Sequence, residues 1–201
     1  MKLVLATNNQ GKVKELAVML QPLGFQVVPI GEYPDFQEVE EDGETFIANA
    51  VKKARAAAEF TGELVLADDS GLEVDALDGA PGVYSARFAG EPESDAANNR
   101  KLLALLEGVP PEKRTGRFRC VIAIAEPTGQ VHTAEGFCEG YILEELKGEG
   151  GFGYDPLFYI PQYKQTFAEI DIKNKNAISH RGQALNKAVE MLNHLCASRE
   201  G

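Results

Sequence analysis

The N-terminal part of the chain changes its hydrophobic periodicity within a few residues. Lys2–Ala6 is a short apolar segment rich in Leu and Val, and the polar stretch Thr7–Lys12 interrupts it. Apolar residues then recur at the i, i+3, i+4, i+7 spacing of an amphipathic helix, at Val13, Leu16, Ala17 and Leu20. Pro22-Leu23-Gly24 ends this pattern, and Phe25–Pro29 is a second predicted strand. The order strand, polar loop, helix, strand indicates an α/β fold.

The middle of the chain continues the alternation of helical and strand patterns. A helix is predicted from the four-residue spacing of its apolar positions, Phe46, Ala50, Ala54 and Ala58. Glu63–Ala67 is predicted to be a strand that ends abruptly at Asp68-Asp69-Ser70-Gly71, and Leu77–Gly90 is loop-like. A third helix is expected over Asp95–Leu106.

The last third of the chain contains a predicted hairpin and a predicted terminal helix. Arg114–Glu126 and Gln130–Leu143 are strand-like and are joined by the turn Pro127-Thr128-Gly129. Ser179 is suited to cap the last helix, whose buried face is expected to be Leu185, Ala188, Val189, Leu192 and Leu195. We find no internal repeat or long linker, so residues 1–201 are interpreted as one domain.

Composition narrows the class of function. The hydrophobic fraction of 44% and the charged fraction of 25% are those of a soluble globular protein, and no signal peptide or membrane-spanning run is visible, so we expect a cytoplasmic protein. The net charge of −11 argues against nucleic-acid partners, and the lack of a long apolar run argues against a membrane partner. Cys120, Cys138 and Cys196 lack metal-ligand spacing, and we expect them to be buried free thiols.

Thr7–Lys12 is a candidate phosphate-binding loop. It lies between a predicted strand and a helix N-terminus, where backbone N–H groups and the helix dipole favour anions. Lys12 adds a positive charge. The stretch is neither a Walker A nor a GxGxxG sequence, and an ordinary capped turn explains it about as well.

Acidic residues form a candidate metal site. Asp68 and Asp69 are adjacent, and a divalent cation would relieve their mutual repulsion, although a solvated turn is the alternative. Glu40 and Glu41, in an acidic run before a predicted helix, could complete an oxygen shell for Mg²⁺ or could form a solvated capping face.

Two further segments are candidates for binding a base. Gly150–Pro156 carries Phe152 and Tyr154 on a glycine-rich backbone beside Asp155, so a ring could stack on a base and the carboxylate could accept its N–H groups; both rings could instead be core. Lys175 and Ser179-His180-Arg181 place cations near a helix N-terminus, which is unfavourable unless something negative or electron-rich lies beside them.

Five motifs in a fixed order resemble those of the inosine/xanthosine triphosphate pyrophosphatases, the Ham1-like enzymes that act on non-standard purine nucleotides. The motifs are Thr7-Asn8-Asn9-Gln10-Gly11-Lys12, Ala67-Asp68-Asp69-Ser70-Gly71-Leu72, Gly79-Ala80-Pro81-Gly82-Val83-Tyr84-Ser85-Ala86-Arg87, Gly150-Gly151-Phe152-Gly153-Tyr154-Asp155-Pro156 and Ser179-His180-Arg181-Gly182. The resemblance covers essentially the whole chain. It departs from the family at Asn8, where the first motif commonly has glycine.

The resemblance implies an elongated mixed β-sheet flanked by helices, with two lobes and a cleft, usually as a homodimer. It implies Mg²⁺-dependent hydrolysis of ITP, dITP and XTP to the monophosphate and pyrophosphate. Residues expected to hold the triphosphate are Thr7, Asn8, Asn9, Gln10, Gly11, Lys12 and Lys53. Those expected to place the metal are Glu40 or Glu41 with Asp68 and Asp69, and Asp69 is also the expected general base. Those expected beside the nucleoside are Ser70, Phe152, Gly153, Tyr154, Asp155, Lys175, His180 and Arg181.

Selectivity for these purines follows from donor and acceptor chemistry. Inosine and xanthosine carry a 6-oxo acceptor where adenine carries a 6-amino donor, and Arg181 and protonated His180 are donors only. One unsatisfied buried group would disfavour ATP by roughly 1–3 kcal/mol. Guanine also has a 6-oxo group, so this argument does not exclude GTP. A pyrophosphatase of other base preference and a non-catalytic nucleotide sensor are the alternatives.

Overall fold

The computed structural model describes residues 2–20 and 24–197, which form two compact units. Unit 1 contains the described parts of residues 1–69, 120–136 and 183–201, and unit 2 contains residues 70–119 and 137–182. Three long strands pass from one unit into the other, at the Asp69–Ser70, Arg119–Cys120 and Gly136–Phe137 peptides. A fourth crossing, at Gly182–Gln183, lies in helix α5.

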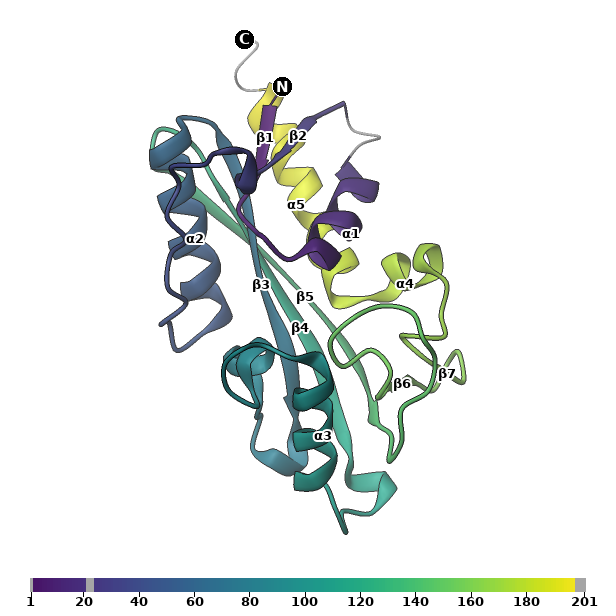
Figure 1. Ribbon diagram of the computed structural model, residues 1–201. Helices are drawn as coiled ribbons and strands as arrows, with labels where there is room; N and C mark the ends of the chain where they lie inside the picture. Colours follow the sequence, from purple (N-terminus) through teal and green to yellow (C-terminus); the bar gives the residue numbers. More distant parts are fainter. Residues whose placement is uncertain (1, 21–23, 198–201) are drawn as a thin grey trace. The chain divides into compact units, whose positions relative to one another are not determined.

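Seven strands form one mixed sheet in the order β2-β1-β3-β4-β5-β6-β7 (Figure 1). The strands are β1 (Lys2–Leu5), β2 (Gln26–Pro29), β3 (Leu64–Val74), β4 (Thr115–Ala125), β5 (Val131–Ile142), β6 (Phe158–Ile160) and β7 (Gln165–Thr166). β1 pairs in parallel with β2 and β3, whereas β6 pairs antiparallel with β5 and β7.

Five α-helices accompany the sheet in the described part of the chain. They are α1 (Gln10–Leu20), α2 (Phe46–Thr61), α3 (Asp95–Leu105), α4 (Ile172–Ile178) and α5 (His180–Ala197). Short 3-10 turns occur at Ile30–Glu32, Asp75–Leu77, Gly82–Arg87 and Pro111–Lys113. None of the described helices is both long and apolar enough to cross a bilayer.

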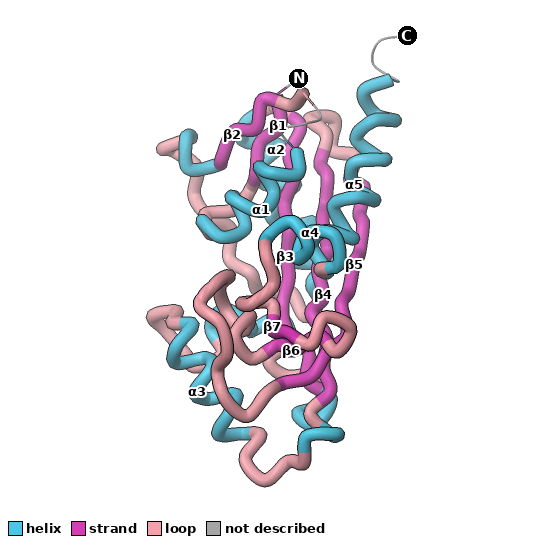
Figure 2. Tube along the Cα trace, turned by 90° about the vertical axis from the view of Figure 1, so that its right-hand side faces the viewer, coloured by secondary structure: helices cyan, strands magenta, loops and turns pink. Residues whose placement is uncertain are grey.

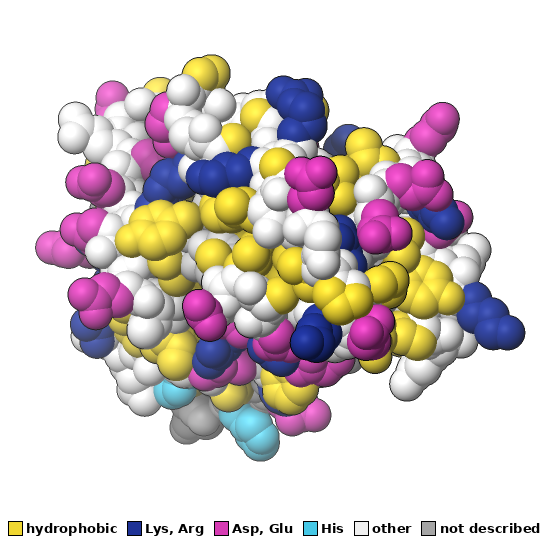
Figure 3. Space-filling model, turned by 90° about the horizontal axis from the view of Figure 1, so that it is seen from below, with side chains coloured by type: hydrophobic (Ala, Val, Ile, Leu, Met, Phe, Trp, Pro, Cys, Tyr) yellow, Lys and Arg dark blue, Asp and Glu magenta, His cyan; other side chains and the backbone are white. Residues whose placement is uncertain are grey.

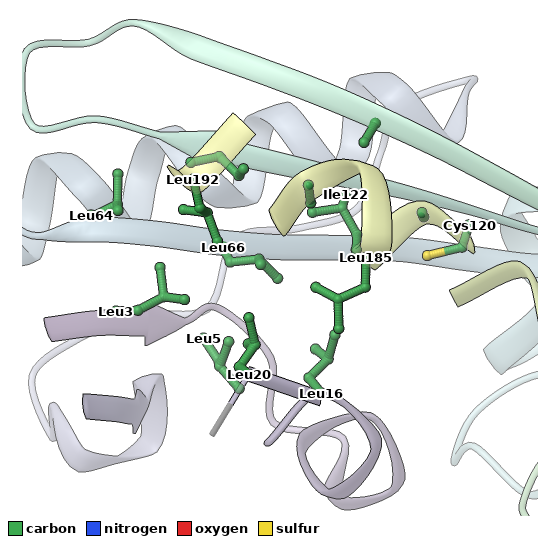
Figure 4. Close-up of a cluster of buried hydrophobic side chains, with 14 residues drawn as sticks. Leu3, Leu5, Leu16, Leu20, Leu64, Leu66, Cys120, Ile122, Leu185 and Leu192 are labelled. Atoms are coloured by element: carbon green, nitrogen blue, oxygen red, sulfur yellow. The ribbon is translucent and has the colours of Figure 1, made fainter. Parts of the chain in front are cut away.

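Unit 1 is a three-layer arrangement. α1 and α5 cover one face of its part of the sheet and α2 covers the other, as the two perpendicular views show (Figures 1 and 2). The core between the sheet and the first pair of helices contains Leu3, Leu16, Leu66, Ile122 and Leu185, all 0% exposed (Figure 4). The apolar stripes of α1 and α5 therefore lie where their sequence spacing predicts.

Unit 2 has its own core around the other halves of the long strands. Leu72 of β3 and Leu102 of α3 pack there with Phe118, Phe158 and Phe167. The three phenylalanine rings contact one another, with centroid separations of 4.6–5.8 Å. Tyr154 and Leu157, from the segment that follows the glycine-rich stretch, are part of the same core.

The α/β class, the mixed sheet, the hairpin and the helices at 46, 95 and 180 are confirmed. The predicted strand end at Asp68-Asp69-Ser70-Gly71 is wrong, because β3 continues through this segment to Val74. A strand interior tolerates the two aspartates here because lysines neutralise them. α4, β6 and β7 were not predicted, since such short elements carry little periodicity. The predicted stop at Pro22-Leu23-Gly24 lies mostly outside the described residues.

Surface charge and thiols complete the description. Acidic and basic side chains are interspersed among apolar ones on the face seen in Figure 3, without a continuous basic area among the residues drawn there. Cys120 is a buried free thiol, as expected, whereas the free thiol of Cys138 is only half-buried. The side chain of Cys196 lies outside the described set.

Candidate active site

The turn between β1 and α1 is organised by Asn9. Its side-chain Oδ1 accepts hydrogen bonds from the backbone N–H groups of Gly11 and Lys12, at 3.0 and 3.1 Å, and its own N–H donates to Thr7 Oγ1 at 3.2 Å. Asn9 thus caps α1. The sequence suggested that the loop offers its backbone N–H groups to an anion, but those of Gly11 and Lys12 are occupied by this cap. Thr7 is half-buried, while Asn8, Asn9 and Gln10 are exposed and accessible to a ligand.

The same turn places Lys12 against β3. Leu5, the last residue of β1, is paired with Leu66, and β3 then extends beyond the end of β1. Asp68 therefore lies just past the carboxyl end of β1, although it is in the middle of its own strand. Lys12 Nζ lies 3.1 Å from Asp68 Oδ2, and the Asp68 side chain is fully buried.

Lys53 joins the second aspartate to the acidic run. It projects from α2, and its Nζ lies 2.5 Å from Glu41 Oε1, 4.0 Å from Asp69 Oδ1 and 2.8 Å from the carbonyl oxygen of Asp68. One ammonium group thus lies beside two carboxylates, Glu41 and Asp69, that are far apart in the sequence. Glu41 is 30% exposed at its side chain, whereas Glu40 is exposed.

Burial and neighbouring charges shift the protonation of this cluster. Desolvation raises the pKa of Asp69 above its ordinary value, although Lys53 and Lys12 oppose the rise. Burial alone would lower the pKa of Lys53, but Glu41, Asp69 and Asp68 outweigh it and raise that pKa. A carboxylate of raised pKa is a better proton acceptor once it is ionised, which suits a general base.

Hard oxygen ligands are present in unit 1, each balanced by an ammonium group. Within residues 2–20 and 24–197, no three His, Cys, Asp or Glu side chains are already gathered as a ligand cluster. Glu41, Asp68 and Asp69 nevertheless form the donor set that Mg²⁺ prefers, because all three offer carboxylate oxygens. Displacement of a lysine toward a phosphate would make their oxygens available.

In unit 2, Asp155 shapes the glycine-rich loop. Its Oδ2 accepts hydrogen bonds from the Phe152 N–H at 2.9 Å and from Lys175 Nζ at 2.7 Å. A Cβ at Gly151, where φ is +72°, would lie 2.0 Å from the same oxygen, so only glycine fits. Oδ2 of Asp155 therefore already accepts two hydrogen bonds within the protein, and the carboxylate connects the glycine-rich loop to Lys175.

Three buried basic side chains surround the rings of this unit. Lys175, His180 and Arg181 are each at most 4% exposed. Lys175 Nζ and the Arg181 guanidinium carbon lie 5.2 and 5.6 Å from the centroid of the Phe152 ring, and His180 stacks on Phe118 at 4.7 Å. Asp155 offsets the cost of burying the Lys175 cation in α4, and the Phe152 ring offsets that of Arg181 at the start of α5.

Arg181 also contacts the residue that follows the aspartate pair. Its Nη2 donates a hydrogen bond to Ser70 Oγ at 2.9 Å, across 111 positions of sequence. The first turn of α5 is stabilised by Ser179 Oγ, which accepts from the Gly182 N–H at 3.1 Å, as the predicted cap requires. A donor-only guanidinium therefore lies beside Ser70.

A family model, described as the Ham1 family, matches residues 3–191 of the chain. The chain belongs to the Ham1 family. A relative from Desulforamulus reducens, named dITP/XTP pyrophosphatase, is 76% identical over 200 residues and covers 100% of both chains. A relative of the same name from Geobacter sulfurreducens is 56% identical over 184 residues, with 92% of each chain covered.

Solved structures of Ham1 proteins share this fold. The Ham1 protein of Staphylococcus aureus superimposes with a TM-score of 0.86 at 44% identity, covering 96% of this chain and 99% of its own. That of Coxiella burnetii gives a TM-score of 0.87 at 43% identity with the same coverage. The seven-stranded mixed sheet with flanking helices is thus the Ham1 fold.

The structure places the predicted residues of this Ham1 protein in two groups. Unit 1 holds the residues assigned to phosphate and metal: Thr7, Asn8, Asn9, Gln10, Gly11, Lys12, Glu40, Glu41, Lys53, Asp68 and Asp69. Unit 2 holds those assigned to the nucleoside: Ser70, Phe152, Gly153, Tyr154, Asp155, Lys175, His180 and Arg181. Ion pairs link Lys12, Glu41, Lys53, Asp68 and Asp69 in the first group, but Glu40 takes no part in them.

Asn8 and Tyr154 show what residue type alone could not indicate. Among described non-glycine residues only Asp78 and Lys164 have positive φ, so Asn8 fits the turn without entering the left-handed region that glycine favours.

The Tyr154 ring is part of the unit 2 core, and its hydroxyl donates to the Ser85 carbonyl oxygen at 2.8 Å. Burial raises the pKa of that hydroxyl. The side chain of Tyr154 is therefore engaged within the core rather than offered for stacking on a base.

Asn49 is a functional candidate that the sequence reasoning missed. It is fully buried on α2, one helical turn before Lys53, and its side chain hydrogen-bonds Asp69. Its Oδ1 also accepts from the Gly43 N–H at 2.8 Å, which anchors the acidic segment to the helix. The sequence did contain a signal for Asn49, because it is a polar residue on the apolar face of a predicted helix, between Phe46 and Ala50.

Proposed function

We propose that this protein hydrolyses dITP, ITP and XTP to the corresponding monophosphate and pyrophosphate, with Mg²⁺ as its cofactor. The observation that carries the proposal is the buried cluster in which Lys12 and Lys53 meet Asp68, Asp69 and Glu41. The names of the relatives at 76% and 56% identity support the same activity. By the family resemblance we also propose that the enzyme works in the cytoplasm as a homodimer.

The residues of unit 1 supply charge and a proton acceptor. The ammonium groups of Lys12 and Lys53 bind phosphate oxygens, and Glu41, Asp68 and Asp69 would hold Mg²⁺. The bound metal would neutralise phosphate charge and make the α-phosphorus more electrophilic. Asp69 accepts a proton as water attacks that phosphorus, the bond from the α-phosphorus to the bridging oxygen breaks, and pyrophosphate leaves with this oxygen.

The residues of unit 2 supply base recognition. Phe152 offers a ring for stacking, and Arg181 and protonated His180 offer donors to the 6-oxo group of the purine. An adenine 6-amino group would meet donors only, which leaves buried polar groups unsatisfied at a cost of roughly 1–3 kcal/mol. A bias of about tenfold to hundredfold against dATP follows, because about 1.4 kcal/mol corresponds to a factor of ten.

The test is replacement of Asp69 by asparagine. Asp69→Asn keeps the shape of the side chain but removes the proton acceptor, so pyrophosphate release from dITP should fall by at least about a hundredfold, with the thermal unfolding temperature largely kept. Glu44→Gln, an exposed neighbour in the acidic run, is the matched control and should retain the wild-type rate.

Different outcomes point to the alternatives. Near-normal turnover by the folded Asp69→Asn protein would rule out Asp69 as the base. A panel of nucleotides scored for pyrophosphate against orthophosphate tests the base preference. Tight binding of ITP without Mg²⁺-dependent pyrophosphate release would indicate a nucleotide sensor.

A further inference from the structure

Two side chains of helix α3 form hydrogen bonds with the backbone N–H and the backbone carbonyl group of Gly153, in the glycine-rich loop. The Gly153 N–H donates to Asp95 Oδ2 at 2.7 Å, and Asn99 Nδ2 donates to the Gly153 carbonyl oxygen at 2.9 Å. Asp95 and Asn99 are four residues apart, so they project from the same side of α3. The two side chains thereby grip Gly153 from 58 and 54 positions away in the sequence.

The helix that carries this clamp is itself firmly attached. Leu102 packs fully buried into the unit 2 core, and Ser94 Oγ caps the helix by accepting from the Ala97 N–H at 3.3 Å. On another side of α3, the buried Asn98 donates to the carbonyl oxygens of Ser85 and Ala86, at 3.3 and 2.7 Å. α3 is therefore a fixed support for the loop.

Gly153 is the place in the loop where such a support matters. It has φ +61° and no Cβ, and a Cβ built there would meet nothing within 4 Å, so no side-chain packing limits its backbone. It directly follows Phe152 and precedes Tyr154, and Asp155 bonds back to the Phe152 N–H at 2.9 Å. A rotation of the peptide at Gly153 would turn the Phe152 ring and loosen that bond.

We propose that Asp95 and Asn99 are positioning residues for base recognition, which they serve by fixing the Gly153 peptide and thereby the orientation of Phe152 and Asp155. The inference rests on the proposed function and extends it to two residues outside the five motifs. Neither side chain needs to touch the substrate. Their effect is to present a preformed loop to the purine, which lowers the cost of ordering that loop on binding.

The two members of the clamp contribute unequally. Asn99 is 6% exposed, so its hydrogen bond is shielded from water, whereas Asp95 is exposed and its bond competes with solvent. Asn99 Oδ1 is buried and accepts no hydrogen bond from the described residues. Replacing Asn99 therefore removes the better shielded of the two hydrogen bonds to Gly153. It leaves no donor unsatisfied, because none of the described residues donates to Asn99 Oδ1.

The experiment compares four variants with the unmodified enzyme. Asn99→Leu removes the donor at similar volume and should raise KM for dITP by about tenfold, with kcat changed by less than about threefold, because the carboxylates of unit 1 are untouched. Asp95→Ala should raise KM by about threefold. Asp95→Asn keeps an oxygen acceptor and should restore KM. Ser94→Ala, which only weakens the cap, should lower the unfolding temperature without changing KM.

Two further readouts separate positioning from a purely structural role. The ratio of kcat/KM for dITP over dATP should fall in Asn99→Leu and Asp95→Ala, and the Gly153 amide should exchange its hydrogen faster in Asp95→Ala. Lower stability with unchanged KM, base selectivity and amide exchange would overturn the inference. If the unmodified protein released no pyrophosphate, the proposed function would fail, and the Gly153 exchange rate would still decide whether Asp95 restrains the loop.

Discussion

Lys52 and Lys53 are consecutive residues of α2 that meet different surroundings. Lys52 is 41% exposed at its side chain and pairs at 2.6 Å with Asp42, which is itself 60% exposed. Lys53 is 11% exposed and lies between Glu41 and Asp69. Successive helical residues point about a quarter turn apart, so one ammonium group faces water and the other enters the acidic cluster.

Removing each lysine in turn gives a matched pair of variants. Lys53→Met should reduce kcat/KM for dITP by at least about a hundredfold, because it removes a phosphate ligand and leaves two neighbouring carboxylates without their shared cation. Lys52→Met should stay within about twofold of wild type, since an exposed ion pair contributes little. Steady-state pyrophosphate release measures both. Equal losses in the two variants would contradict the role given to Lys53.

At the scale of elements, the strand pairs of unit 2 are cross-linked by exposed charges. Arg117 on β4 lies 2.8 Å from Glu139 on β5 and 3.0 Å from Asp75, which follows β3. The Thr115 hydroxyl donates to Asp75 at 2.6 Å. The Thr115 hydrogen bond first, and Arg117 with it, hold the pKa of Asp75 below its ordinary value.

The sign of the resulting pH effect follows from linkage. Because the folded-state pKa of Asp75 is lower than its unfolded value of about 3.9, its contribution to stability is present above that value and is lost as pH falls through the folded pKa. Asp75→Asn should lower the free energy of unfolding by about 0.5 kcal/mol at pH 7, a small figure because the pair is exposed. The difference from wild type should be smaller at pH 3, below the unfolded value, than at pH 7.

Urea denaturation at both pH values measures this difference. Asp78→Asn, at an exposed acid in the adjoining turn, is the control, and its effect should not follow the same pH course. A constant gap between Asp75→Asn and wild type from pH 7 to pH 3 would show that Asp75 does not stabilise the strand pairs through its charge.

At the scale of the whole molecule, the acidic cluster is balanced internally. Each buried aspartate of β3 has a lysine beside it, Lys12 for Asp68 and Lys53 for Asp69. The cores of the two units are apolar and separate from this cluster. We therefore expect folding to need no metal ion to neutralise the aspartates, whereas the proposed chemistry needs one.

Metal removal should thus separate activity from stability. Treatment with EDTA should abolish pyrophosphate release from dITP while shifting the unfolding temperature by less than about 3 °C, roughly the change that 1 kcal/mol makes in a protein of this size. Excess Mg²⁺ should restore the rate. Full activity in EDTA would refute the proposed metal requirement, and unfolding in EDTA would show that the ion is structural.

Local features of the fold could be predicted from the chain alone. The helices at 46, 95 and 180 and the hairpin at 115–142 were foreseen because periodicity, caps and turns depend on residues only a few positions apart. The motifs that indicated the family are short for the same reason. Both the α/β class and the family followed from these local signals.

The tertiary structure alone decided how far β3 extends and which side chains meet. The strand runs through Asp68 and Asp69 because partners from distant segments, Lys12 and Lys53, neutralise them. Glu41 rather than Glu40 pairs with Lys53, and side chains of α3 hydrogen-bond to Gly153. Neither contact can be predicted from a short stretch of neighbouring residues. Burial and long-range hydrogen bonds are properties of packing, and they exist only once segments far apart in the sequence are brought into contact.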